Sequence, residues 1–171
     1  MVGLFDILGP VMVGPSSSHT AGACRLGLMA RAVLGETPGE ATIRLHGSFA
    51  ATGHGHGTHR AIVGGLLGMA PDDLRLRTAF EEAERAGLTY AFEDVDLGDD
   101  AHPNSVVFRV RTGEESVTLR GASVGGGRVE VTEIDGFPVR LGGAYDTLVL
   151  VAKDRPGTIA AISAVFAEDD V

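Results

Sequence analysis

The sequence predicts an α+β fold, with helices packed on a largely antiparallel sheet. Up to about Gly87, apolar residues recur mostly at the three- and four-residue spacing of helices. From Leu88 onward the pattern changes to short alternating stretches separated by glycine-rich turns, which is typical of antiparallel strands. Helices that share a core with such a sheet make an α+β domain. The apolar fraction of 44% is large enough to supply that core.

The first helix is predicted after Thr20, where apolar residues from Ala21 to Val33 recur at helical spacing. Ser18 or Thr20 can cap its start, and Gly35 is expected to end it. Cys24 lies on the apolar stripe of this helix. We therefore interpret Cys24 as a small core residue in preference to a reactive thiol.

The next elements alternate between strand and helix. Residues 42–46 alternate as a strand, in which His46 is expected to be structural, and this strand leads into a glycine-rich loop over 47–58. Helical spacing resumes from Thr58 to Leu67, and a third helix is predicted over 72–86, ending at Gly87.

Antiparallel strands are expected in the second half of the chain. They cover residues 106–110, 116–119, 128–131 and 137–140. Gly125–Gly127 is more typical of a turn or bulge than of a phosphate-binding loop. The Asp99-Asp100 pair is expected in a solvated loop.

A second, smaller unit is predicted after a hinge at Gly142-Gly143. Residues 145–152 read as a strand, and an apolar helix is expected through Phe166, with Pro156 near its first turn. One strand and one helix cannot close a core of their own, so this unit is expected to be incomplete. Its apolar faces and free strand edge favour a homo-oligomer.

Composition excludes several classes of function. A net charge of −9, 5% aromatic residues and no clustered Lys/Arg argue against a nucleic-acid partner. We expect a cytoplasmic, soluble protein, because no apolar run is long enough to span a membrane and residues 1–6 lack a basic signal-peptide region. The single cysteine cannot form an internal disulfide or hold an iron–sulfur cluster by itself.

Two histidine-bearing segments, 15–20 and 47–59, contain four of the six histidines. Both place hydroxyls, imidazoles and free N–H groups where a helix begins, which suits an anion such as a carboxylate. His54 and His56 are the candidates for proton transfer, because glycine neighbours leave them accessible; the alternative is that they only hydrogen-bond the loop. The candidate substrate- or anion-binding residues are Ser16, Ser17, Ser18, His19, Thr20, Ser48, Thr52, Thr58 and Asn104. For Asn104, which follows Pro103, an Asx turn is an equally good interpretation.

Four motifs, taken in order, resemble the β subunit of iron–sulfur L-serine dehydratases. The motifs are Pro15–Thr20, Gly47–Thr58, His102–Asn104 and Ser123–Gly127. The resemblance covers residues 1–141 as the β domain, whereas residues 144–171 resemble the opening half of an ACT domain, a ligand-sensing module. The family usually has Asp where this chain has His59, which puts any role for a carboxylate there in doubt.

The resemblance implies an enzyme that converts L-serine to pyruvate and ammonia. It also implies a four-iron four-sulfur cluster held by a partner α subunit, in agreement with the lone cysteine here. His54 and His56 would then serve catalysis at a site shared with that subunit, and no metal is expected on this chain. A regulatory module that binds serine or another small anion is the main alternative. A zinc hydrolase using His54, His56 and His59 is a remote one.

Overall fold

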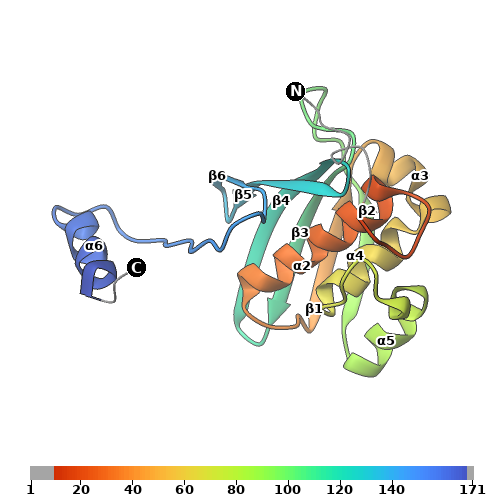
Figure 1. The fold of residues 1–171 in the computed structure, drawn as a ribbon, viewed down its shortest axis with the longest axis horizontal. Coiled ribbons are helices and arrows are strands. Elements are labelled where there is room, and N and C mark those ends of the chain that lie inside the picture. Colours follow the sequence, from red (N-terminus) through yellow and green to blue (C-terminus); the bar gives the residue numbers. More distant parts are fainter. Residues whose placement is uncertain (1–9, 169–171) are drawn as a thin grey trace.

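A six-stranded sheet with helices on one face forms the body of the computed structural model, which describes residues 10–168 (Figure 1). The strands are β1 (Glu40–Leu45), β2 (Thr89–Asp94), β3 (Ser105–Thr112), β4 (Glu115–Gly125), β5 (Arg128–Ile134) and β6 (Phe137–Leu141). Their order across the sheet is β2-β1-β3-β4-β5-β6. The predicted α+β class is confirmed, and all pairs are antiparallel except β1 with β2.

Seven helical segments accompany the sheet in the described residues. They are η1 (Ser17–Gly22), α2 (Ala23–Leu34), α3 (Ser48–His56), α4 (Thr58–Leu66), η2 (Leu74–Thr78), α5 (Ala79–Ala86) and α6 (Thr158–Glu168). The segments from α3 to α5 connect β1 to β2, and this helical crossover is what allows those two strands to run parallel.

Successive side chains of a strand point to opposite faces of the sheet, so one face of each central strand packs in the core. Val106, Phe108 and Val110 of β3 are fully buried, while Arg109 between them is exposed. The turn predicted at Gly125–Gly127 is confirmed: it joins β4 to β5, and all three glycines have positive φ. Strand β2 was not expected from the sequence, because it lies at the sheet edge and Tyr90 and Phe92 are only partly buried.

Helices α2 and α4 cross in close contact. A Cβ added to Gly65 would lie 2.1 Å from the carbonyl oxygen of Cys24, and one added to Gly27 would lie 2.4 Å from that of Ile62. The glycines therefore let the two backbones touch. Cys24 is fully buried, and its thiol donates to the carbonyl of Met69 at 3.1 Å. Its interpretation as a core residue is confirmed.

The helical start near residue 20 differs from the prediction. Ser16, and not Ser18 or Thr20, is the cap: its Oγ accepts from the N–H of His19 at 3.1 Å, and a π-helical turn, η1, precedes α2. Thr20 is buried, and its hydroxyl instead donates to the carbonyl of His56 at 3.2 Å. Gly35 ends α2 in the left-handed conformation, as predicted.

The segment 47–58, predicted to be a loop, is helix α3 followed by the start of α4. The many glycines of this segment favoured a loop in the sequence, but nine of its residues form a helix. This helix lies between Gly47 and Gly57, which both have positive φ. Phe49 anchors α3 because it is fully buried. The helix predicted over 72–86 is also shorter, since it starts as the 3₁₀ turn η2 and becomes α-helical only at Ala79.

The strand predicted over 145–152 is not present in the described part of the chain, although α6 forms as predicted. A strand requires a hydrogen-bonded neighbour, and none of the six strands pairs with this segment. In Figure 1, α6 lies apart from the sheet at the end of this extended stretch, and none of its residues is buried. No helix within residues 10–168 is long and apolar enough to cross a membrane.

Candidate functional site

Helices η1 and α3 bring two of the sequence motifs together. His19 Nε2 lies 3.0 Å from Thr52 Oγ1 and 3.2 Å from Ser48 Oγ. Ser48 and Thr52 are one turn apart on α3, and the Thr52 hydroxyl donates to the Ser48 carbonyl at 2.8 Å. Toward His19, therefore, the Thr52 oxygen accepts, and Nε2 of His19 carries the proton. We call His19, Ser48, Thr52 and the neighbouring His56 the imidazole–hydroxyl cluster.

His56 completes this cluster with the opposite hydrogen-bonding role. Its ring centroid is 5.0 Å from that of His19, and its Nδ1 lies 3.1 Å from the carbonyl oxygen of Thr52. A carbonyl only accepts, so Nδ1 carries the proton, and Nε2 of the neutral ring is left with a free lone pair. His56 is exposed, so that lone pair is available to a ligand.

Burial keeps the His19 ring neutral. Desolvation is the main reason that the pKa of His19 is lowered below its ordinary value, and the neighbouring His56 lowers it further. A contact with the Ser48 backbone acts in the opposite direction. The cluster therefore places a neutral donor at His19 beside His56, whose Nδ1 faces the Thr52 carbonyl.

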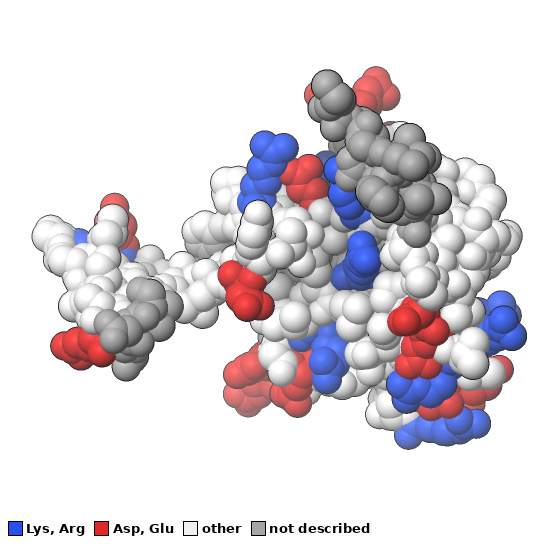
Figure 2. Space-filling model, viewed as in Figure 1, with Lys and Arg blue, Asp and Glu red and all other residues white. Residues whose placement is uncertain are grey.

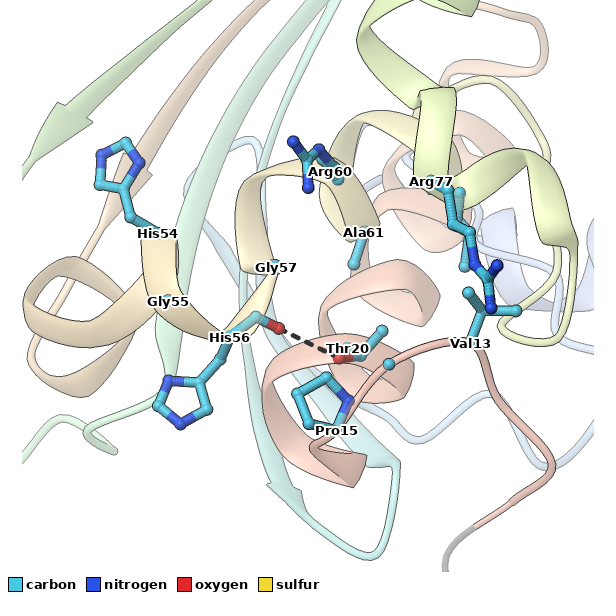
Figure 3. A pocket seen from close by; sticks show the side chains of 12 residues that line it. Val13, Pro15, Thr20, His54, Gly55, His56, Gly57, Arg60, Ala61 and Arg77 are labelled. Carbon is cyan, nitrogen blue, oxygen red and sulfur yellow. Dashed lines mark hydrogen bonds between the residues drawn. The ribbon is translucent and has the colours of Figure 1, made fainter.

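His54 belongs to a different environment. Its ring stacks on that of His59 with centroids 4.1 Å apart, and His59 in turn contacts Phe92 edge-on at 4.3 Å. The rings of His54 and His56 point away from each other in Figure 3. The structure thus separates the two histidines proposed for catalysis: His56 lies with His19, and His54 lies with His59.

The third and fourth motifs lie beside the first two. The carbonyl of Pro103 accepts from the N–H of Ser48 at 2.7 Å, at the start of α3. Asn104 links β3 to β4, since its carbonyl accepts from the N–H of Ser123 at 3.0 Å. Ser123 packs under η1 so closely that a Cβ on Gly22 would lie 2.0 Å from its Oγ. All four motifs therefore meet at one end of the sheet.

The remaining predicted binding residues lie on the η1 turn and at the buried start of α4. Ser16 is the cap of η1, and Ser17 and Ser18 lie half-buried on the same turn. Thr58 is fully buried at the start of α4, and its Oγ1 has no hydrogen-bond partner among the described residues. His46 is structural, as predicted, because its Nδ1 accepts from the N–H of Leu97 at 3.2 Å.

A cavity of about 300 Å³ opens beside the cluster (Figure 3). Thr20, His54 and His56 line it, together with Arg60 and Arg77, which the sequence reading did not select. Arg60 follows His56 by four residues, with Gly57 between α3 and α4 separating the two helices. This short spacing is the sequence signal that could have placed Arg60 near His56. Arg77 lies on η2 and has no comparable local signal.

The described residues offer no site for a metal cluster. Burial raises the pKa of the Cys24 thiol to about 12, so this sulfur is not a ready thiolate ligand. No group of three His, Cys, Asp or Glu side chains within residues 10–168 is placed to hold a metal ion. The zinc hypothesis therefore has no donor set in this part of the chain.

Several known proteins are similar to this chain, two of them over most of its length. The family described as "Serine dehydratase beta chain" matches residues 3–95. The chain is 46% identical over 164 residues to the L-serine dehydratase beta chain of Peptoniphilus asaccharolyticus, covering 95% of this chain and 73% of that protein. It is 44% identical over 165 residues to the probable L-serine dehydratase beta chain of Bacillus subtilis (strain 168), covering 96% and 74% of the respective chains. An L-serine dehydratase of Mycobacterium bovis is 31% identical over 159 residues, which is 34% of its length.

Proposed function

The chain belongs to the serine dehydratase beta chain family, and from this premise we propose that it contributes proton-transfer and substrate-binding residues to an L-serine dehydratase. The reaction is the conversion of L-serine to pyruvate and ammonia, at a site shared with an α subunit. The observation that carries this proposal is the imidazole–hydroxyl cluster, in which His19 contacts Ser48 and Thr52 while His56 presents a free Nε2. The cluster is partly open to solvent, which leaves room for a partner's residues and the substrate.

Dehydration of serine requires removal of the α-proton and departure of the hydroxyl group. We assign proton removal to the exposed imidazoles, His56 foremost, because its tautomer leaves Nε2 as an acceptor. His54 is the second candidate. Its partner His59 has a pKa lowered by burial and by the adjacent His54. His19, Ser48, Thr52 and the Ser16–Thr20 turn bind and orient the polar groups of the substrate.

The iron–sulfur cluster implied by the resemblance does not fit the residues of this chain. Its one cysteine is buried and protonated, and no other donor set is assembled in the described residues. We therefore propose that the α subunit holds the cluster and that this chain supplies only imidazoles, hydroxyls and backbone groups.

Residues 144–171 are proposed to act as a partial ACT-like unit that also supports self-association. Tyr145 is 88% exposed and Ile159 is 81% exposed, and α6 buries none of its residues. An apolar segment of this kind is stabilised when another surface covers it. A homo-oligomer is the association that we propose.

Steady-state kinetics of the enzyme reconstituted with its α subunit tests the catalytic assignment. We expect His54→Ala or His56→Ala to lower kcat by about two to four decades, as removal of a proton-transfer group typically does. Ser17→Ala is expected mostly to raise KM, because it weakens binding without removing the base. Ser116→Ala, at an exposed position on β4, is the matched control for a lost serine hydroxyl.

The outcome separates catalysis from regulation. Unchanged kcat in both histidine variants would contradict the catalytic role. If those variants lost only cooperativity toward serine, the segment would be an effector site, and the regulatory interpretation would replace the catalytic one.

A further inference from the structure

The cavity in Figure 3 shares His56 with the imidazole–hydroxyl cluster, but most of its other walls come from segments that the cluster does not use. Arg60 extends from α4 and Arg77 from η2, at separate rims, and Val13–Pro15 close another side. His19, Ser48 and Thr52 do not line it. Its volume of about 300 Å³ corresponds to roughly ten water molecules at about 30 Å³ each, and it lies at the lower end of the range for small-molecule pockets.

The charges around this cavity are of one sign. Its titratable lining residues are Arg60, Arg77, His54 and His56, and no Asp or Glu lines it. Neither arginine is in an ion pair within the described residues, whereas Arg75 and Arg111 each pair with a carboxylate. A concave site with unneutralised guanidinium groups attracts anions, because the surrounding protein focuses their field.

Arg60 is partly held in place for this role. Its guanidinium carbon lies 5.7 Å from the centroid of the Phe80 ring, an arrangement that stabilises the cation and restricts its side chain. A restricted guanidinium loses less conformational entropy on binding a planar or tetrahedral anion, and its fork matches two oxygens at once.

We infer that this cavity is an anion-binding site, in which Arg60 and Arg77 hold the carboxylate or phosphate group of a small anion. The cavity adjoins the site proposed for serine dehydration and shares Thr20, His54 and His56 with it. What the cavity adds is the pair of arginines, which the proposed reaction does not use. The inference does not depend on the dehydratase reaction, since the residues that carry it are the arginines.

Isothermal titration calorimetry on the full chain without an α subunit tests this inference. Sodium pyruvate and inorganic phosphate serve as separate probes at constant ionic strength, one for each anion chemistry. We expect at least one probe to bind saturably, and Arg60→Gln or Arg77→Gln to weaken that binding at least tenfold. Arg155→Gln, which removes the same charge from an exposed position outside the cavity, is expected to leave the affinity unchanged.

Three results would overturn the inference. The first is no saturable binding of either probe, and the second is affinity that survives both cavity substitutions. The third is an equal loss in Arg155→Gln, which would indicate only a response to net charge. Arg60 and Arg77 are exposed, so the variants are expected to keep the wild-type Tm by circular dichroism. Since the α subunit is absent, these results do not depend on dehydratase activity.

Discussion

His59 is buried between two aromatic rings, with His54 stacked on one side and Phe92 edge-on at the other. Burial first, and then the adjacent His54, lowers its pKa below the ordinary value of 6.5, while the Gly53 backbone and Asp94 oppose the shift. The unfolded chain therefore takes up the proton at a higher pH than the folded protein does. Stability from this residue is fully present above pH 6.5 and is lost as the pH falls below that value.

We therefore expect acidification from about pH 7.5 to about pH 5.5 to lower Tm, with His59 among the causes. His59→Phe removes the titrating group and keeps an aromatic ring, so its Tm is expected to depend less steeply on pH. His102→Asn, at an exposed histidine, is expected to keep the wild-type dependence. Thermal melts at several pH values measure this, and a wild-type slope in His59→Phe would contradict the assignment.

Cys24 shows why this chain is expected to carry no cluster by itself. Its thiol is fully buried, donates to the Met69 carbonyl and has a pKa raised to about 12 by burial. A four-iron cluster requires several thiolates. Anaerobic reconstitution of the isolated chain, followed by iron and sulfide assay, is expected to find no stoichiometric cluster. A cluster bound without a partner subunit would disprove the assignment to the α subunit.

At the scale of elements, the contact between α2 and α4 depends on glycine. The Cβ of Gly65→Ala would lie 2.1 Å from the backbone carbonyl of Cys24, so the helices would have to separate. We expect a loss of about 1–3 kcal/mol in the free energy of unfolding, as for other overpacked cores.

Gly55→Ala is the matched control for this substitution. No atom lies within 4 Å of a Cβ at that position of α3, so alanine is expected to be neutral or stabilising by up to about 1 kcal/mol. Urea denaturation of both variants gives the comparison. Equal stability of Gly65→Ala and wild type would show that the two helices separate at no cost.

At the scale of the whole molecule, charged side chains are spread over the surface, whereas many of the exposed large apolar side chains lie in residues 145–165. Figure 2 shows Lys/Arg and Asp/Glu side chains interspersed over the face in view, without a continuous basic stripe, and the lobe that contains α6 carries a few charges of both signs among white residues. The exposed apolar segment is therefore the surface on which we expect association.

We expect sedimentation of the chain at high micromolar concentration to show a dimer or a larger assembly. Val151→Asp and Ile159→Asp place charges on side chains that are 71% and 81% exposed, and should shift the chain toward monomer. Val124→Asp, at an exposed position on β4, is the control and should not. A wild-type chain that stays strictly monomeric would contradict the proposed association.

The sequence by itself determined the features that depend on local pattern. The alternation through Val106, Phe108 and Val110 predicted β3, and left-handed Gly35 and Gly87 ended helices where expected. The motifs also indicated the family and the residues of its candidate site. These signals survive because a residue's burial periodicity and its turn preference are set within a few positions of the chain.

Only the tertiary structure decided which of these residues meet. It placed His56 beside His19 and His54 on His59, pairs whose contacts depend on how η1, α3 and α4 pack. It showed a helix where glycines at 53, 55 and 57 suggested a loop, because burial of Phe49 outweighs their low helix propensity. It also left 145–152 without a strand, since strand formation depends on a hydrogen-bonding neighbour that local pattern cannot supply.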